Sequence, residues 1–362
     1  QLPCAEPNPC RLLPGPQPGG EDEALAATLW DEALFSSPWA EVSTRLAGAE
    51  AAAKCQRGVA KLLRCEYVES RGMTIVAGTS GLFSSERGAS AEVSLVVSAE
   101  EGAEVQLGEG YRAARRAADI DFAAAGREAG RRASSLLGAR RAKAGKSSVL
   151  FEPWVGVEFL ELLAELLSAE EVQGGRSLLA GKIGRSVASP LVSVRDDPRR
   201  PGGLGSCRFD DEGLPTRDKA MISGGILRGY FHDTASAARE GGSSNGCAFR
   251  GSYKNTPSPG ASNLYLAPGE LTRAGLIAGT REGILVSEVL GMHMVDPISG
   301  AFSVGISGLA VEKGSLTHPV KGAMIAGNLL EMLSRVDGVA DDLIFYGSVG
   351  APTFRVSALD VA

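Results

Sequence analysis

Short runs of strand-forming residues, separated by turns that contain glycine, occupy much of this chain and constrain its fold more than any other feature. Three such runs follow one another between residues 65 and 111, with VSLVVSA (93–99) the clearest, and we expect three antiparallel strands there. From about Gly174 onward, most of the sequence again consists of short strand-like runs and tight turns. The 47 glycines and an aromatic content of only 6% suit many turns better than a helical bundle.

Helical patterns frame the strand-rich parts. Residues 21–60 and 111–141 mix small, apolar and charged side chains as helices do, and a strand at 143–153 leads into an amphipathic helix at 154–172. In that helix one face carries Val157, Leu160, Leu163, Ala164 and Leu167. Shorter helices are expected at 234–240, 269–280 and 325–336. The sequence therefore predicts an α+β fold.

The chain of 362 residues is long enough for two or three domains of about 150 residues each. Six prolines in residues 1–22 indicate an extended leader. We expect a helix-flanked, antiparallel α+β middle domain at 23–146 and a larger, mostly antiparallel, β-rich C-terminal domain at 147–362.

Charge and hydropathy argue against a nucleic-acid-binding protein and against a membrane-spanning protein. The net charge of −6 gives no basic footprint for nucleic acid, and the basic stretch at 112–146 contains acidic residues, as a solvated helix face does. No uninterrupted apolar run reaches about 18 residues, which argues against a membrane span. The start lacks the basic and apolar regions of a signal peptide, so we expect a cytoplasmic protein.

Common catalytic motifs are absent from the sequence. The three histidines, His232, His293 and His318, are too far apart for an HExxH helix, and each is interpreted as structural, although a zinc site assembled from distant residues stays open. There is no GxSxG elbow, and neither Cys207 nor Cys247 has a recognisable paired base. The six cysteines show no CxxC spacing and are too few for a disulfide scaffold.

The acidic cluster Asp210-Asp211-Glu212 has two interpretations. Clustered carboxylates can bind a hard cation or titrate as a coupled acid–base pair. Asp also accepts hydrogen bonds from nearby backbone N–H groups in turns. Because Gly213 and Pro215 follow directly, we favour the turn.

Several segments together resemble the TldD/PmbA (TldE) metallopeptidase family. Five of them occur in the family's order, at 188–240, 262–271, 286–316, 318–333 and 341–362, and residues 79–116 resemble the family's middle domain. The resemblance covers about 66–362. It implies that full-length members carry a further N-terminal α/β domain, so we expect this chain to begin after it, as a naturally short form or a fragment.

The resemblance also implies where a zinc site would lie. TldD-like members have an HExxxH motif at the start of the central helix and a cysteine near the C-terminus as ligands. Aligned on the strand that ends in VLF, the first histidine falls on Glu152, the general-base glutamate on Pro153 and the second histidine on Val157. The cysteine segment falls on 347–350, which has no thiol. We therefore expect no metal ligand and no catalytic residue in this chain, which is the pattern of the PmbA/TldE-type branch, formerly named modulator of DNA gyrase.

The leading hypothesis is a subunit that is inert alone, binds no cofactor itself, and acts on peptides with a zinc-bearing TldD-like subunit or as a homodimer. Its strand edges would present backbone to an extended peptide. Candidate residues of the peptide cleft or interface are Asp210, Asp211, Glu212, Arg217, Asn263 and His293. Two alternatives stay open: a stand-alone hydrolase that uses the acidic cluster with a hard cation, and a regulatory binding protein. The acidic charge argues against direct nucleic-acid contact.

Overall fold

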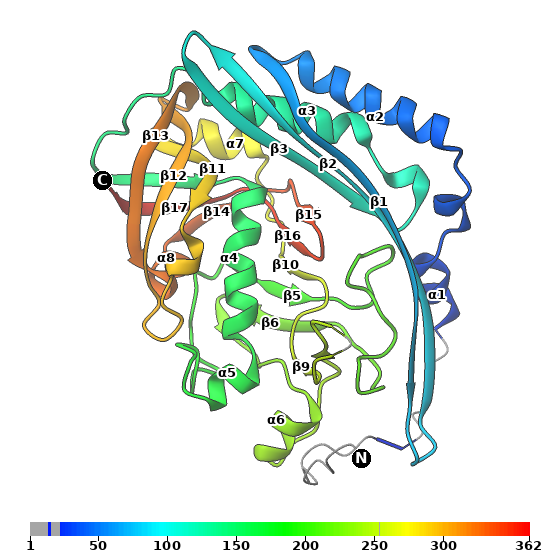
Figure 1. Ribbon diagram of the computed structural model, residues 1–362. Helices are drawn as coiled ribbons and strands as arrows, with labels where there is room; N and C mark the ends of the chain where they lie inside the picture. The colour runs from blue at the N-terminus through cyan, green and yellow to red at the C-terminus, as the bar shows by residue number, and fades with distance from the viewer. Residues whose placement is uncertain (1–13, 16–21, 253) are drawn as a thin grey trace.

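The computed structural model describes residues 14–15, 22–252 and 254–362, and its architecture is α+β. Figure 1 shows helix α4 at the centre, a three-stranded sheet arching along one side, and the sheet that contains β11, β12 and β13 on the other. The expected leader at 1–22 lies, apart from Pro14, Gly15 and Asp22, outside the described residues.

The N-terminal part combines three helices, two short 3-10 helices and three strands. They are α1 (Glu23–Leu29), η1 (Glu32–Phe35), α2 (Trp39–Lys54), β1 (Val59–Ala77), β2 (Phe83–Glu101), β3 (Glu104–Ala114), η2 (Ala117–Asp119) and α3 (Phe122–Ser135). β1 pairs antiparallel with β2 from Val59↔Ala99 to Ala77↔Phe83, and β3 pairs antiparallel with β2. The three antiparallel strands expected from the sequence are confirmed.

Glycine lets α3 lie against the sheet at unusually short range. A Cβ atom added at Gly110 of β3 would lie 1.9 Å from the carbonyl oxygen of Ala125, and one at Gly108 would lie 2.2 Å from that of Ala129. On the other side of α3, a Cβ at Gly126 would lie 1.9 Å from the carbonyl oxygen of Ala49 in α2. Part of the glycine content therefore serves backbone-to-backbone packing rather than turns.

The C-terminal part contains two six-stranded sheets and a small hairpin. Its strands are β4 (Gly145–Phe151), β5 (Val194–Asp196), β6 (Lys219–Ser223), β7 (Ile226–Leu227), β8 (Ala248–Phe249), β9 (Ser258–Pro259), β10 (Leu264–Leu266), β11 (Glu282–Leu290), β12 (Ala301–Glu312), β13 (Ser315–Asn328), β14 (Val336–Val339), β15 (Ile344–Tyr346), β16 (Val349–Ala351) and β17 (Phe354–Val361). Its helices are α4 (Pro153–Leu166), α5 (Ala169–Gln173), α6 (Thr234–Arg239), α7 (Arg273–Ala278), α8 (Leu329–Ser334) and the 3-10 helix η3 (Met292–Met294).

The two large sheets are mostly antiparallel. One has the order β13-β12-β11-β4-β17-β14 and the other β15-β16-β10-β5-β6-β7. The parallel pairs are β4 with β11 and β10 with β16. β4 therefore lies in the interior of its sheet, and its last residue leads directly into α4.

Helix α4 is buried between the sheets. Val157, Leu160 and Leu163 belong to the large hydrophobic core, as expected from their common helix face, and Leu167 joins them just after the helix ends. A separate hydrophobic cluster fills the space between the three-stranded sheet, α2 and α3. The domain boundary at 146/147 stays a prediction.

Two sequence expectations need correction. The helix expected at 111–141 is shorter, because residues 111–114 continue β3 and pair with 91–94, and α3 begins only at Phe122, capped by Asp121. Cross-strand pairing thus outweighs local helical preference. The helix expected at 325–336 is also shorter, because residues 325–328 continue β13 and only Leu329–Ser334 form α8. The short helices predicted at 234–240 and 269–280 are confirmed as α6 and α7. Among the described residues, no helix is long and apolar enough to cross a membrane.

Candidate functional site

The resemblance to the TldD/PmbA family predicts that a metal motif would begin at the first turn of α4. Strand β4 ends at Phe151, Glu152 is the N-cap residue, and Pro153 opens the helix, where its missing N–H group is no loss. Glu152 is only 2% exposed. A carboxylate at this depth needs charged or hydrogen-bonding partners.

Two arginines from distant parts of the chain supply those partners. Arg131 of α3 donates from both terminal nitrogens, Nη1 to Oε1 of Glu152 at 3.1 Å and Nη2 to Oε2 at 3.0 Å. Arg273, the first residue of α7, donates to Oε1 at 2.5 Å. Burial raises the pKa of Glu152, but the two arginine charges outweigh burial and lower the pKa below its usual range. Glu152 is therefore an ionised side chain that joins α3, α4 and α7.

A second buried carboxylate lies beside this group. Glu128 of α3 accepts from Arg112, from Arg132 at 2.6 Å, and from the hydroxyl of Tyr346 at 2.5 Å. Burial, followed by the charge of Glu128, raises the pKa of Tyr346, so this hydroxyl stays protonated as a donor. Trp154 of α4 packs edge-on against the ring of Tyr346, and the two ring centroids are 4.8 Å apart.

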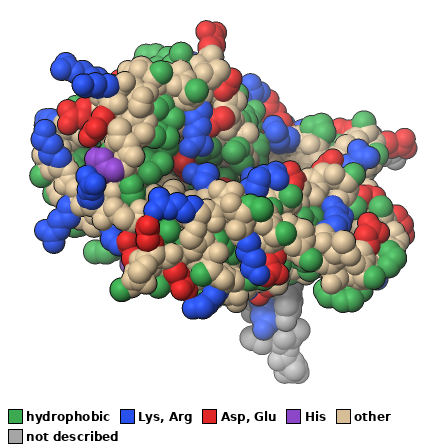
Figure 2. Space-filling model, turned by 90° about the horizontal axis from the view of Figure 1, so that it is seen from above, with side chains coloured by type: hydrophobic (Ala, Val, Ile, Leu, Met, Phe, Trp, Pro, Cys, Tyr) green, Lys and Arg blue, Asp and Glu red, His purple; other side chains and the backbone are tan. Residues whose placement is uncertain are grey.

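The two glutamate clusters surround one cavity of about 330 Å³. Its lining residues come from β3, α3, the start of α4, α7 and β15: Arg112, Ala124, Arg127, Glu128, Arg131, Glu152, Pro153, Arg273, Ile344 and Tyr346. The lining contains four arginines and two glutamates, a net charge of +2. We call it the arginine cavity. Figure 2 shows a hollow on one face of the molecule, with Lys and Arg side chains at its border.

The expected zinc positions have the wrong donors for that metal. Zinc in proteins prefers imidazole, thiolate and unpaired carboxylate ligands. Pro153 and the buried Val157 offer none, and both carboxylate oxygens of Glu152 are occupied by arginine. Residues 347–350 include part of β16, which packs against α4, and their side chains offer a single hydroxyl, Ser348. Within the part of the chain that the structure describes, no three His, Cys, Asp or Glu side chains gather as metal ligands would.

The acidic cluster forms a loop whose carboxylates are bound by nearby backbone and hydroxyl groups. Buried Asp210 accepts from the N–H groups of Glu212, Leu214 and Ala248. Asp211 accepts from the N–H of Arg250. Burial raises the pKa of Asp210 to about 6.

Glu212 completes the same loop. It accepts from both the N–H and the hydroxyl of Thr234, the first residue of α6. These contacts match the turn that the sequence favoured.

The remaining candidate residues lie apart from the arginine cavity. Asn263 is fully buried and connects Gly205, Ser206 and Asp197 by hydrogen bonds. Arg217 is exposed and donates to the carbonyl of Ser244.

His293 lies in a different cavity, with Glu158 and Glu165 of α4. There burial, with the charges of Glu161 and Glu288, raises the pKa of Glu158 to about 7.

The sequence interpretation did not predict the ion pairs between arginines and buried glutamates. The basic stretch at 112–146 was expected to be a solvated helix face, and for Arg112, Arg131 and Arg132 this is wrong, because each binds a buried glutamate. One local signal exists: Glu128 and Arg132 have the i,i+4 spacing of a helical ion pair. The partnership of Arg131 and Arg273 with Glu152 has no local signal.

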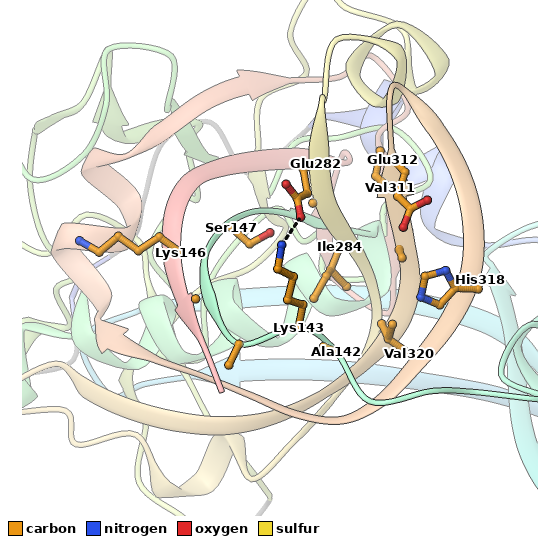
Figure 3. Close-up of a pocket in the computed structure, with 14 residues that line it drawn as sticks. Ala142, Lys143, Lys146, Ser147, Glu282, Ile284, Val311, Glu312, His318 and Val320 are labelled. Carbon is orange, nitrogen blue, oxygen red and sulfur yellow. Dashed lines mark ion pairs between the residues drawn. The ribbon is translucent and has the colours of Figure 1, made fainter.

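A cavity of about 340 Å³ lies at the opposite end of β4 (Figure 3). Figure 3 shows Lys143 pointing toward Glu282 of β11, at 3.7 Å, while His318 lies on the other side. Both charged side chains are largely exposed, at 87% and 70%, so water screens their attraction. No candidate residue from the sequence lies in this cavity.

The two cysteines considered as nucleophiles are poorly suited to that role. Burial raises the pKa of Cys247 to about 12 and raises that of Cys207 as well. Thiols with raised pKa values stay protonated, whereas a nucleophile needs the thiolate. Cys4 and Cys10 lie outside the described residues.

Comparison with known proteins identifies relatives along most of the chain. Residues 37–137 match the family model of the PmbA/TldA metallopeptidase central domain, and residues 144–362 match that of the C-terminal domain. The Metalloprotease TldD homolog of Haemophilus influenzae is 36% identical over 62% of this chain and 46% of its own length. Metalloprotease PmbA of Escherichia coli O157:H7 is 25% identical over 97% of this chain and 76% of its own. The chain spans about half the length of the first curated relatives it matches.

Solved structures show the same fold. A Thermotoga maritima protein, named as a proposed modulator of a DNA gyrase, superposes with a TM-score of 0.86 at 30% identity, over 92% of this chain and 77% of that one. TldE from Thermococcus kodakarensis superposes with a TM-score of 0.86 at 21% identity, over 99% of this chain and 81% of that one. From the two domain matches, which together span most of its length, the chain belongs to the PmbA/TldA metallopeptidase family.

Proposed function

We propose that this chain is a PmbA/TldE-type subunit that has no zinc centre of its own and acts on peptides together with a zinc-bearing, TldD-like subunit. One observation carries the proposal. Where the family's metal motif would begin, the structure has an ionised Glu152 held by Arg131 and Arg273.

Electrostatics explains why this arrangement disfavours a metal. Two guanidinium groups within 3.1 Å of the carboxylate would repel a dication that approached the same oxygens. Peptide hydrolysis by zinc also needs an open coordination position and a base beside it. Pro153 stands where that base would be, and proline has no side-chain group that can accept a proton.

The same ion pairs give the subunit a positive structural role. They connect the helix that would hold the metal to α3 on one side and to α7 on the other. The chain thereby keeps the family's scaffold while its own catalytic chemistry is absent. A partner subunit would supply the zinc, and this chain would form part of the surroundings of the peptide.

Two results test this function. Size-exclusion chromatography of the chain mixed with the TldD-like homologue of the same organism should give a heterodimer. The mixture should hydrolyse peptides faster than the partner alone, and a zinc chelator should abolish the activity. Failure to form a complex, with no gain in activity, would contradict the proposal.

Among the described residues, no observation favours the hypothesis of a stand-alone hydrolase. Its carboxylates, Asp210 and Glu212, are buried and accept hydrogen bonds from the backbone and from Thr234. A cation would have to displace those donors before it could bind.

A further inference from the structure

We propose that the arginine cavity binds the carboxylate of a peptide, so that this subunit contributes an anchor for the substrate rather than a metal. The inference rests on the proposed function only for the nature of the ligand, a peptide; the cavity and its charge are features of the chain itself.

The arginine cavity keeps a positive charge after its internal ion pairs are formed. Four arginines face two glutamates across the lining, which leaves two positive charges without an internal counterpart in the cavity. Arg127 is the clearest of the four. Among the residues that the structure describes, it forms one ion pair, with Asp121 at 3.5 Å, and both side chains are more than half exposed, so that pair is weak.

Two arginines of the cavity have N–H donors beyond those that bind the glutamates. An arginine has five N–H donors in a planar fork that matches a carboxylate. Arg273 directs one terminal nitrogen, Nη2, to Glu152. Arg112 uses a single terminal nitrogen, Nη1, for Tyr111 and Glu128. Within the described part of the chain, no hydrogen bond uses the second terminal nitrogen of either arginine, so each can donate to a further acceptor.

Three arginines of the cavity are preorganised by the buried glutamates. Glu152 fixes Arg131 through two hydrogen bonds and Arg273 through one, and Glu128 fixes Arg112. The cations are therefore held in place before a ligand arrives, and ordering them does not add to the entropic cost of binding. The buried carboxylates thus orient the arginines without neutralising the cavity.

The rest of the cavity lining suits the end of a peptide. Pro153, Ile344 and Ala124 provide apolar surface beside the charges. A volume of about 330 Å³ lies at the lower end of the range for ligand pockets, about 300–1,000 Å³, and fits a terminal residue rather than a folded partner.

Direct binding to the purified chain, without a partner, tests the inference. Isothermal titration calorimetry would use three probes: N-acetyl-trialanine with a free C-terminal carboxylate, its C-terminal amide, and an amidated peptide with one glutamate side chain. We expect the first to bind and the plain amide to fail. Binding of the third as well would indicate that a side-chain carboxylate also serves, and binding of the first alone would indicate a C-terminus. Binding should weaken as salt is raised.

Two variants should weaken binding for different reasons. Arg127→Gln removes a weakly paired cation, and the affinity for the carboxylate peptide should fall roughly tenfold. Glu152→Gln removes the charge that holds Arg131 and Arg273 in place, so the affinity should fall as well. Arg176→Gln is the matched control, since Arg176 is also an exposed arginine with one carboxylate partner, Glu171, and lies outside the cavity. It should leave the affinity unchanged.

Three results would overturn the inference: equal binding of acid and amide peptides, no change on Arg127→Gln, or an equal loss on Arg176→Gln. These are separable from failure of the proposed function. Loss of carboxylate binding with an intact, zinc-dependent heterodimer would reject the cavity alone. Carboxylate binding without a heterodimer or any activity would reject the proposed function alone.

Discussion

Two sites in this chain each contain a buried carboxylate, and the carboxylate has a different role in each. Glu152 is neutralised by arginine side chains from α3 and α7, borders a cavity, and has a lowered pKa. Asp210 is bound by backbone N–H groups within a loop and has a pKa raised to about 6. The first site joins distant elements beside space for a ligand, and the second fixes a turn. Burial of a carboxylate therefore does not identify a functional site until its partners are known.

The largest expected effect is on the Glu152 side of this comparison. Arg131→Ala should lower the free energy of unfolding by about 2–4 kcal/mol, because it leaves a buried carboxylate with a single cation. Arg127→Ala, one helical turn earlier on α3, removes only a weak exposed pair and should cost less than about 1 kcal/mol. Urea denaturation of both variants measures the difference. Equal losses would mean that the Glu152 cluster contributes no more than a surface pair.

The pH dependence separates the two acids next. The raised pKa of Asp210 means that the folded state holds this proton more tightly than the unfolded state, whose pKa is near 3.8. Its contribution to stability is therefore full below about pH 4 and is lost as the pH rises through about 6, an effect of about 3 kcal/mol. Asp210→Asn should remove this fall from the stability profile.

Glu152 has the opposite sign. Its lowered pKa gives stability that is present above the unfolded value of 4.5 and is lost as the pH falls through the folded value. Denaturation at a series of pH values from about 3 to about 8 covers the unfolded pKa values of both carboxyl groups. It measures how the free energy of unfolding depends on pH for each group. A wild-type profile identical to that of Asp210→Asn would contradict the assigned environment of Asp210.

A smaller effect is expected within the acidic loop. Glu212→Ala leaves the N–H and hydroxyl of Thr234 without their acceptor and should cost about 1–2 kcal/mol. Asp211→Ala removes one acceptor at an exposed backbone N–H and should change stability by no more than about 0.5 kcal/mol. Thermal unfolding compares the two.

The same loop also tests the hydrolase alternative. Asp211→Asn should leave the peptidase activity of the chain mixed with its TldD-like partner unchanged. Loss of that activity in a folded variant would return the acidic cluster to consideration as a reaction centre.

The smallest effect concerns the cavity in Figure 3. Lys143→Ala breaks an exposed pair with Glu282 and should alter stability by less than about 0.5 kcal/mol. A loss comparable with that of Arg131→Ala would show that exposure does not distinguish the two ion pairs.

Local patterns in the sequence were enough for the elements and for the turn. The strand-forming run at 93–99 predicted antiparallel strands, though not their length, and the helical spacing of Val157, Leu160 and Leu163 predicted the buried face of α4. Gly213 and Pro215 favoured a turn at the acidic cluster, and the backbone bonds of Asp210 have that form.

Local sequence patterns could not predict the arginine cavity. Arg131, Glu152 and Arg273 are 21 and 121 positions apart, and they meet only because α3 and α7 both lie beside the first turn of α4. The end of β3 was missed for a similar reason, since pairing with β2 decides it. The sequence alone predicted that the metal motif is missing, but the partners of Glu152 at that position required tertiary structure.

The most direct test of the account is a zinc titration of the isolated, purified chain, followed by elemental analysis after gel filtration. We expect no zinc to remain at one equivalent per chain, whereas the chain together with its TldD-like partner should retain zinc. One tightly held zinc per isolated chain, released by Glu152→Ala, would contradict the claim that arginine side chains have replaced the metal at the start of α4.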